Sequence, residues 1–130
     1  MNEGHPMQKI HNPNGAPAAY SDGIETPADA RTLYLSGQVG IKSDKSIPSG
    51  ITEQTEVLFA NMKSILESAD MTFEDIVKTT VYMTNPDDYK LFAATRSKLL
   101  GDVKPASTLV YVSGLVFPEL LVEVEGVAVK

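Results

Sequence analysis

The hydrophobic pattern near the C-terminus alternates with a period of two, which predicts β-strands. Two runs rich in β-branched residues, at 108–112 and 121–129, flank a short connection. We interpret them as two strands that pair with each other. In the second run, Glu123 and Glu125 fall on one face with Val127. The other face carries only small or apolar residues: Val122, Val124, Gly126 and Ala128. Because lone carboxylates are costly to bury, we expect the glutamate face to meet solvent, a cleft or another subunit.

In the middle of the chain the pattern changes to that of amphipathic helices. Over residues 52–69, charged side chains fall opposite an apolar stripe at helical spacing, formed by Leu58, Met62, Ile65, Leu66 and Ala69. A second helix is predicted from Tyr89 to Leu100. Asp87 or Asp88 would cap its start, and Gly101 would end it.

Short apolar or β-branched stretches predict the remaining strands, at residues 7–10, within 16–24, at 32–36 and at 75–83. Gly37 and Gly40 follow the third of these stretches and indicate a bulge or a close approach by another group. The order is three strands, a helix, a strand, a helix and two strands. This order predicts an α+β fold in which one mixed sheet carries two helices on one face.

With both helices on one face, the other face of the sheet has no cover of its own. Its strands are apolar in both directions, and a large exposed apolar patch usually marks a subunit interface. We therefore expect a symmetric oligomer, whose order the hydrophobic pattern leaves open.

Length and composition narrow the class of protein. With 130 residues and 42% hydrophobic content, we expect one globular domain, residues 1–130, with a loose N-terminal segment at residues 1–6. The net charge of −6 argues against a nucleic-acid partner. We see no signal peptide and no apolar run near the roughly 20 residues of a membrane helix, so we expect a cytoplasmic protein without a membrane partner.

Composition also excludes several kinds of site. The chain has no cysteine, which removes disulfides, thiolate zinc sites and cysteine nucleophiles. The two histidines, His5 and His11, lack the spacing of metal ligands, so we expect no metal.

Several segments together resemble the enamine/imine deaminase family known as RidA or YjgF. The matching segments follow the family's order along nearly the whole chain: PAAYSDG at 17–23, LSGQ at 35–38, DIVKTTVYM at 75–83, Pro105-Ala106, and VEVEGVAV at 122–129. The resemblance implies a chorismate-mutase-like fold and a homotrimer with three sites in the clefts between subunits. It also implies hydrolysis of reactive 2-imino or 2-enamino acids without metal or organic cofactor.

The resemblance implies a role for Glu123 and for three pocket residues. Glu123 aligns with the glutamate that positions the attacking water, and its alternative is a salt bridge across the subunit interface. Tyr20 aligns with a pocket tyrosine, although packing against its neighbours is the other interpretation. Ser36 and Gly37 align with the Ser-Gly of the site wall. Glu125 is interpreted as structural.

The chain departs from the family at one position. The arginine of the family's Pro-Ala-Arg motif, which binds the substrate carboxylate, is replaced by Ser107. A serine hydroxyl offers one donor and no charge, whereas a guanidinium gives two parallel charge-assisted bonds. Ser107 and Thr108 would instead give hydroxyl contacts to the ligand; the alternative is that Ser107 is only a small replacement in a pocket that has lost its task. Lys104 is the one nearby candidate for a substitute cation.

These observations leave a leading hypothesis and an alternative. The leading one is a RidA-like deaminase that acts on a small-molecule imine or enamine, with an atypical substrate because the arginine is missing. The alternative is a non-catalytic small-molecule-binding or regulatory trimer of the same fold. An endoribonuclease, an activity reported for some family members, fits poorly with a net charge of −6.

Overall fold

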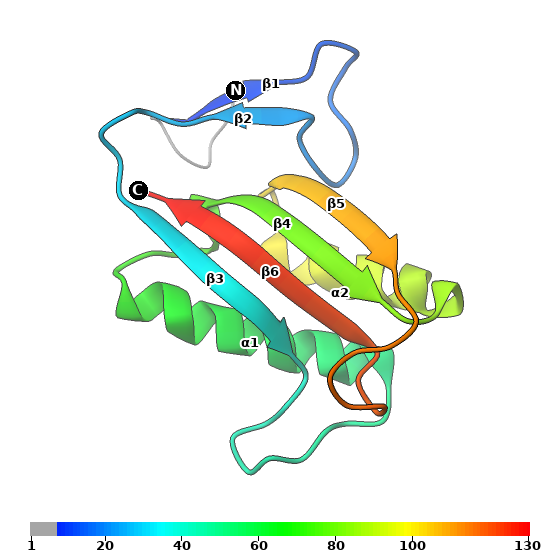
Figure 1. Cartoon of the computed structure of the whole chain (residues 1–130). Coiled ribbons are helices and arrows are strands. Elements are labelled where there is room, and N and C mark those ends of the chain that lie inside the picture. The colour runs from blue at the N-terminus through cyan, green and yellow to red at the C-terminus, as the bar shows by residue number, and fades with distance from the viewer. Residues whose placement is uncertain (1–7) are drawn as a thin grey trace.

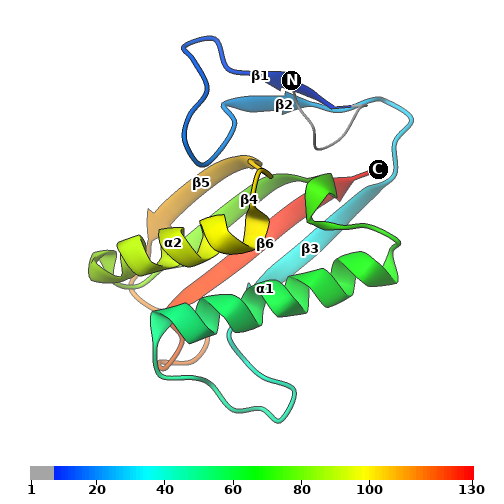
Figure 2. The same ribbon diagram turned by 180° about the vertical axis from the view of Figure 1, so that it is seen from behind.

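The computed structural model describes residues 8–130, so the expected loose segment at residues 1–6 and position 7 of the first predicted strand lie outside it. A four-stranded mixed sheet carries both helices on one face (Figure 1), as the view from behind also shows (Figure 2). The elements are β3 (Thr32–Val39), α1 (Ile51–Ser68), β4 (Ile76–Met83), α2 (Tyr89–Leu100), β5 (Ala106–Tyr111) and β6 (Val122–Val129). The predicted α+β arrangement and element order are therefore confirmed. In the described part of the chain, no helix is long and apolar enough to cross a membrane.

Strand β6 lies in the interior of the sheet, whose order is β3-β6-β4-β5. It pairs antiparallel with both β3 and β4, while β4 and β5 are parallel. The prediction that the last two strands pair with each other was therefore wrong. Parallel strands need a long crossover, and α2 provides one between β4 and β5. The connection after β5 then passes β4 to reach the interior position, which a pattern of two apolar runs does not reveal.

The first two strands form a sheet of their own. Strands β1 (Lys9–His11) and β2 (Gly23–Glu25) pair antiparallel and lie across one end of the main sheet (Figure 1). The connection between them is fastened to the start of β5. Ser21 donates from its backbone N to the Pro105 carbonyl oxygen at 3.1 Å and from its Oγ to the Lys104 carbonyl oxygen at 2.6 Å.

The core fills the space between the main sheet and the two helices. The predicted stripe of α1 is buried or packed against the core, and Glu56, Lys63 and Glu67 are exposed. The sheet contributes alternate residues from its two interior strands: Ile76, Val81, Met83, Val122, Val124 and Ala128. Each of these side chains except Ala128, fully removed from water, contributes about 1.5–3 kcal/mol.

One polar side chain, Gln54 at the start of α1, is fully buried in this core. Its Nε2 donates to the carbonyl oxygens of Pro48 at 2.8 Å and Glu119 at 2.9 Å. Its Oε1 accepts from the backbone N of Leu121 at 2.8 Å. A Cβ at Gly40 would lie 2.7 Å from the Gln54 Cα, so the predicted close approach at Gly40 is to α1. One amide thus ties two loops to the helix.

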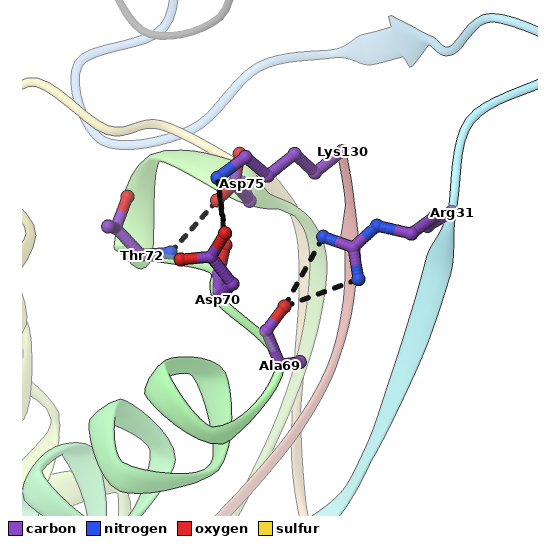
Figure 3. Close-up of polar contacts among 6 residues, drawn as sticks. All are labelled: Arg31, Ala69, Asp70, Thr72, Asp75 and Lys130. Carbon is purple, nitrogen blue, oxygen red and sulfur yellow. Dashed lines mark hydrogen bonds and ion pairs between the residues drawn. The ribbon is translucent and has the colours of Figure 1, made fainter.

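Two cations fix the other end of α1 (Figure 3). Both Nη atoms of Arg31 donate to the Ala69 carbonyl oxygen at 3.2 Å, and Lys130 Nζ donates to the Asp70 carbonyl oxygen at 2.8 Å. Ala69 is the C-cap of α1, so its carbonyl oxygen has no partner within the helix and the Arg31 guanidinium stabilises this helix end; Lys130 binds one residue beyond, at Asp70. They fasten the start of β3 and the end of β6 to α1.

We predict that Gln54→Leu lowers the free energy of unfolding by about 3 kcal/mol, because three backbone groups lose their buried partner. Urea unfolding of the purified chain measures this loss. Lys63→Leu, an exposed position on the same helix, is the control and should change stability by less than about 0.5 kcal/mol. Equal stability of the two variants would contradict the assignment of Gln54 as a tie between loops.

Candidate functional site

The face of the main sheet that faces away from the helices carries the two glutamates of β6, as predicted. Glu123 is half-buried and lies in one cross-strand row with Tyr82 of β4, while Glu125 is exposed. Large hydrophobic side chains lie on the same face, and Tyr34 of β3 is 77% exposed. This face, which points toward the viewer in Figure 1, has no cover within the described residues.

Three of the predicted site residues lie together where β3 meets β6. Strand β3 has a bulge between Leu35 and Gln38, which agrees with the irregularity predicted there. A Cβ at Gly37 would overlap the carboxylate of Glu123, so that carboxylate lies directly against the Gly37 backbone. Ser36, the preceding residue, is exposed. We call Ser36, Gly37 and Glu123 the β3–β6 group.

A phenol lies beside these carboxylates. Tyr82 Oη donates to Glu125 Oε1 at 3.2 Å. Loss of water contact raises the pKa of Tyr82, and the negative charge of Glu125, the hydrogen bond to it and the charge of Glu123 raise it further. The electrostatic environment on this part of the face therefore disfavours additional negative charge.

Of the other three predicted residues, Ser107 and Thr108 lie at the start of β5, and Tyr20 lies in the connection between β1 and β2. Ser107 lies opposite Thr79, which is 4% exposed and donates from Oγ1 to Ser107 Oγ at 3.2 Å. Ser107 therefore belongs to the helix side of the sheet. Thr108 follows on the open side, where Lys78 Nζ donates to its Oγ1 at 2.8 Å. Tyr20, 43% exposed, belongs to the connection fastened to this strand. We call Tyr20, Ser107 and Thr108 the β5 group.

Within one chain the two groups are far apart. Strands β3 and β5 are the outer strands of the sheet, with β6 and β4 between them. Three strand spacings separate Ser36 from Thr108, which amounts to about 14 Å. One copy of the chain therefore divides the six predicted residues into two separate groups.

Sequence reasoning missed Lys78. It lines a shallow hollow of about 240 Å³ on the open face together with Ser36 and Glu125. The alternation of the strand after Asp75 was a usable signal, because it sets Lys78 on the same face as Tyr82. Lys104, the candidate substitute cation, is exposed and lines a different cavity. Among residues 8–130, no cluster of three acidic or histidine side chains is arranged to hold a metal ion.

Comparisons with known proteins agree with this fold. The family model described as Endoribonuclease L-PSP matches residues 10–130. RutC family protein PH0854 of Pyrococcus horikoshii is 33% identical over 75% of this chain and 79% of its own length. The 2-iminobutanoate/2-iminopropanoate deaminase of Mus musculus is 34% identical over 64% of this chain and 63% of its own length.

Solved structures show the same arrangement of helices and sheet. YyfB of Yersinia pestis, from the conserved Rid protein family, has a TM-score of 0.83 at 27% identity and covers 94% of this chain and 98% of its own. TdcF of E. coli, crystallised with bound serine, has a TM-score of 0.73 at 24% identity and covers 89% of this chain and 91% of its own. Proteins of this fold thus include one that binds a small organic molecule.

We predict that Glu125→Gln lowers the pKa of Tyr82 toward the ordinary tyrosine value of about 10, because a negative charge that opposes ionisation is removed. Because the folded-state pKa is raised, the stability that Tyr82 contributes is present at neutral pH and is lost as pH rises through that pKa. The difference in ultraviolet titration between each protein and its Tyr82→Phe counterpart measures the shift. Glu67→Gln, on an exposed helix surface, is the control. An unmoved Tyr82 pKa in Glu125→Gln would contradict the contact.

Proposed function

The chain belongs to the Endoribonuclease L-PSP family, and on that premise we propose that it hydrolyses a reactive imine or enamine at a site shared between neighbouring copies of the chain. The observation that carries the proposal is the division of the candidate residues into the β3–β6 group and the β5 group on opposite edges of one sheet. A second copy is needed to bring a β5 group against a β3–β6 group. The 34% sequence identity with the 2-iminobutanoate/2-iminopropanoate deaminase of Mus musculus supports the reaction class.

The reaction needs a water and a base. An enamine first tautomerises to the imine, water then adds to the imine carbon, and the C–N bond breaks to give a carbonyl compound and ammonia. Glu123 would position the water and take its proton. Its carboxylate lies against Gly37, so a substrate that meets it also meets the backbone of the β3 bulge. Tyr20 and the hydroxyl of Thr108 would close the pocket from the other copy.

The uncovered sheet face supports assembly as a homotrimer. Tyr34 is 77% exposed and Val110 is 40% exposed, and both lie on the side opposite the helices. Exposed apolar side chains on an uncovered sheet face favour an interface, and soluble oligomers are mostly closed and symmetric. A trimer would cover the face and give three equivalent shared sites.

The β5 group supports an atypical substrate. Ser107 carries no charge, and its hydroxyl is paired with that of Thr79. Lys78, bonded to Thr108, would supply one positive charge but not the planar fork of an arginine. We therefore propose that the chain represents a branch without the Pro-Ala-Arg arginine and that it prefers an imine whose recognition does not depend on a bidentate carboxylate.

The pairing of Ser107 with Thr79 also favours a second candidate function. A β5 group without the arginine could still bind a ligand but would not orient it for attack by water. Such a site would suit a binding or regulatory protein. Turnover separates the two functions, because only the hydrolase accelerates the release of ammonia.

We predict that Glu123→Gln slows ammonia release from an imine generated by an amino-acid oxidase by about 10²–10⁴-fold, because the general base is lost. Glu125→Gln, the same change two residues away, is the matched control and should keep most of the activity. Ser107→Arg should increase the rate on 2-imino acids, because a guanidinium would again bind the substrate carboxylate through two hydrogen bonds. A wild-type chain that does not accelerate the reaction on any imine tested would favour the binding function.

We predict that Tyr20→Ala, which removes a side chain proposed to close the pocket, and Glu123→Gln, which removes the proposed base, each lose most activity alone and recover part of it when they are unfolded and refolded together. In a mixture of Tyr20→Ala with Glu123→Gln, random assortment would give about a quarter of the shared sites both intact residues. A mixture of Gly37→Ala with Glu123→Gln is the control. It should stay inactive, because both changes affect the β3–β6 group and every copy then carries a defective one. Absence of recovery in the first mixture, with assembly intact, would mean that each site lies within one chain.

A further inference from the structure

The ammonium of Lys78, on the open face of the sheet, bonds a hydroxyl and not a carboxylate. Its Nζ donates to Thr108 Oγ1 at 2.8 Å. No ion pair within residues 8–130 includes Lys78, although Glu125 lines the same shallow hollow. The positive charge of Lys78 is therefore directed at the β5 group.

The strand register explains this contact. Lys78 lies directly opposite Ala106 of β5, and Thr108 is two residues further along the same face of that strand. The methyl group of Ala106 offers the ammonium no acceptor, and the lysine stem is long enough to reach the next side chain. Glu125 lies opposite Thr80 in β6, on the other side of β4 from Thr108. The lysine thus leans toward β5.

The contact also sets the direction of the Thr108 hydroxyl. A lysine ammonium has three donors and no acceptor, so Thr108 Oγ1 accepts in this bond. The hydroxyl keeps one proton of its own, and no acceptor for that proton is found in the described part of the chain. Thr108 is exposed, so a bound molecule can take this hydrogen bond. A hydroxyl that accepts from a cation is also a stronger donor, because linked hydrogen bonds polarise one another.

The charges around the shared site decide which acceptor suits this donor. The inference rests on the proposed function for that site, in which Thr108 of one copy faces Glu123 of another. The Glu123 carboxylate opposes a second negative charge, and Ser107 supplies no guanidinium to offset it. A neutral carbonyl oxygen accepts one hydrogen bond and adds no charge, so it suits the site better than a carboxylate.

We propose that Lys78 is a positioning residue that turns Thr108 into the hydrogen-bond donor for a neutral carbonyl oxygen of the substrate. The preferred substrate class is therefore an imine next to an amide or ester carbonyl, in place of a free 2-imino acid. Lys78 acts through Thr108 and does not itself contact the substrate. One directed donor does here what two bonds from an arginine would do for a carboxylate.

Calorimetric titration with 2-oxobutanamide, a stable ketone analogue of such an imine, tests this assignment without turnover. The wild-type chain should bind it about tenfold more tightly than 2-oxobutanoate, which has a carboxylate in place of the amide. Thr108→Val and Lys78→Met should each weaken binding of the amide about tenfold, because the directed donor is lost. Thr108→Ser and Lys78→Arg keep the hydroxyl and the cation and should bind as the wild type does. Lys63→Met, at an exposed position of α1, is the control.

The double variant separates positioning from direct contact. If Lys78 acts through Thr108, Lys78→Met should weaken binding no further once Thr108→Val is present. Losses that add would mean that the ammonium binds the probe itself, and they would overturn the assignment. So would a Lys78→Met variant that binds as tightly as the wild type, or a wild-type chain that does not bind the amide.

Nuclear magnetic resonance places the probe in the unaltered chain. The methyl signal of Thr108 should shift as 2-oxobutanamide is added, and an unmoved signal at saturation would overturn the assignment. A chain that binds the probe with the non-additive pattern but accelerates no imine hydrolysis would support the role of Lys78 and contradict the hydrolase. A chain that hydrolyses imines while Lys78→Met binds the probe normally would do the reverse.

Discussion

The interior position of β6 is the constraint on which the rest of this structure depends. Its Val122, Val124 and Ala128 are buried under the helices, so the alternation of the strand sends Glu123 and Glu125 to the opposite face. The neighbouring strands follow the same division, because a strand pairs in the register that keeps its apolar residues on the covered side. Both helices pack on that side. The chain is thus left with an open face that combines acidic groups with exposed aromatic and aliphatic surface.

This division explains why the candidate chemistry is spread over the sheet. The bulge of β3 and the absence of a side chain at Gly37 let the Glu123 carboxylate lie against the backbone at one edge. At the other edge, the hairpin connection that carries Tyr20 is fastened through Ser21 to the segment before β5, the strand that carries Ser107 and Thr108. Under the proposed function, each edge would supply part of what imine hydrolysis requires. Assembly of copies through the open face would both cover apolar surface and complete the site.

Much of the fold could be predicted from local periodicity, because the helix stripe around Leu58 and the alternation around Glu123 are properties of short segments. The strand that pairs with β5 could not be predicted, because a run such as 108–112 has the same pattern whether it lies beside β4 or beside β6. The three hydrogen bonds of Gln54 also depend on residues far apart in the sequence. For the site, the resemblance gave residue types, but it could not reveal that Ser107 is paired with Thr79 or that Lys78 bonds Thr108.

The most direct test of the shared site is chemical cross-linking of the double variant Ser36→Cys with Thr108→Cys, in a chain that has no other cysteine. About 14 Å separates the two positions within one chain, so a bismaleimide shorter than this can join them only between copies. The account predicts covalently linked species up to the trimer, whereas each single-cysteine variant gives dimers at most. Monomers alone from a folded double variant would contradict it.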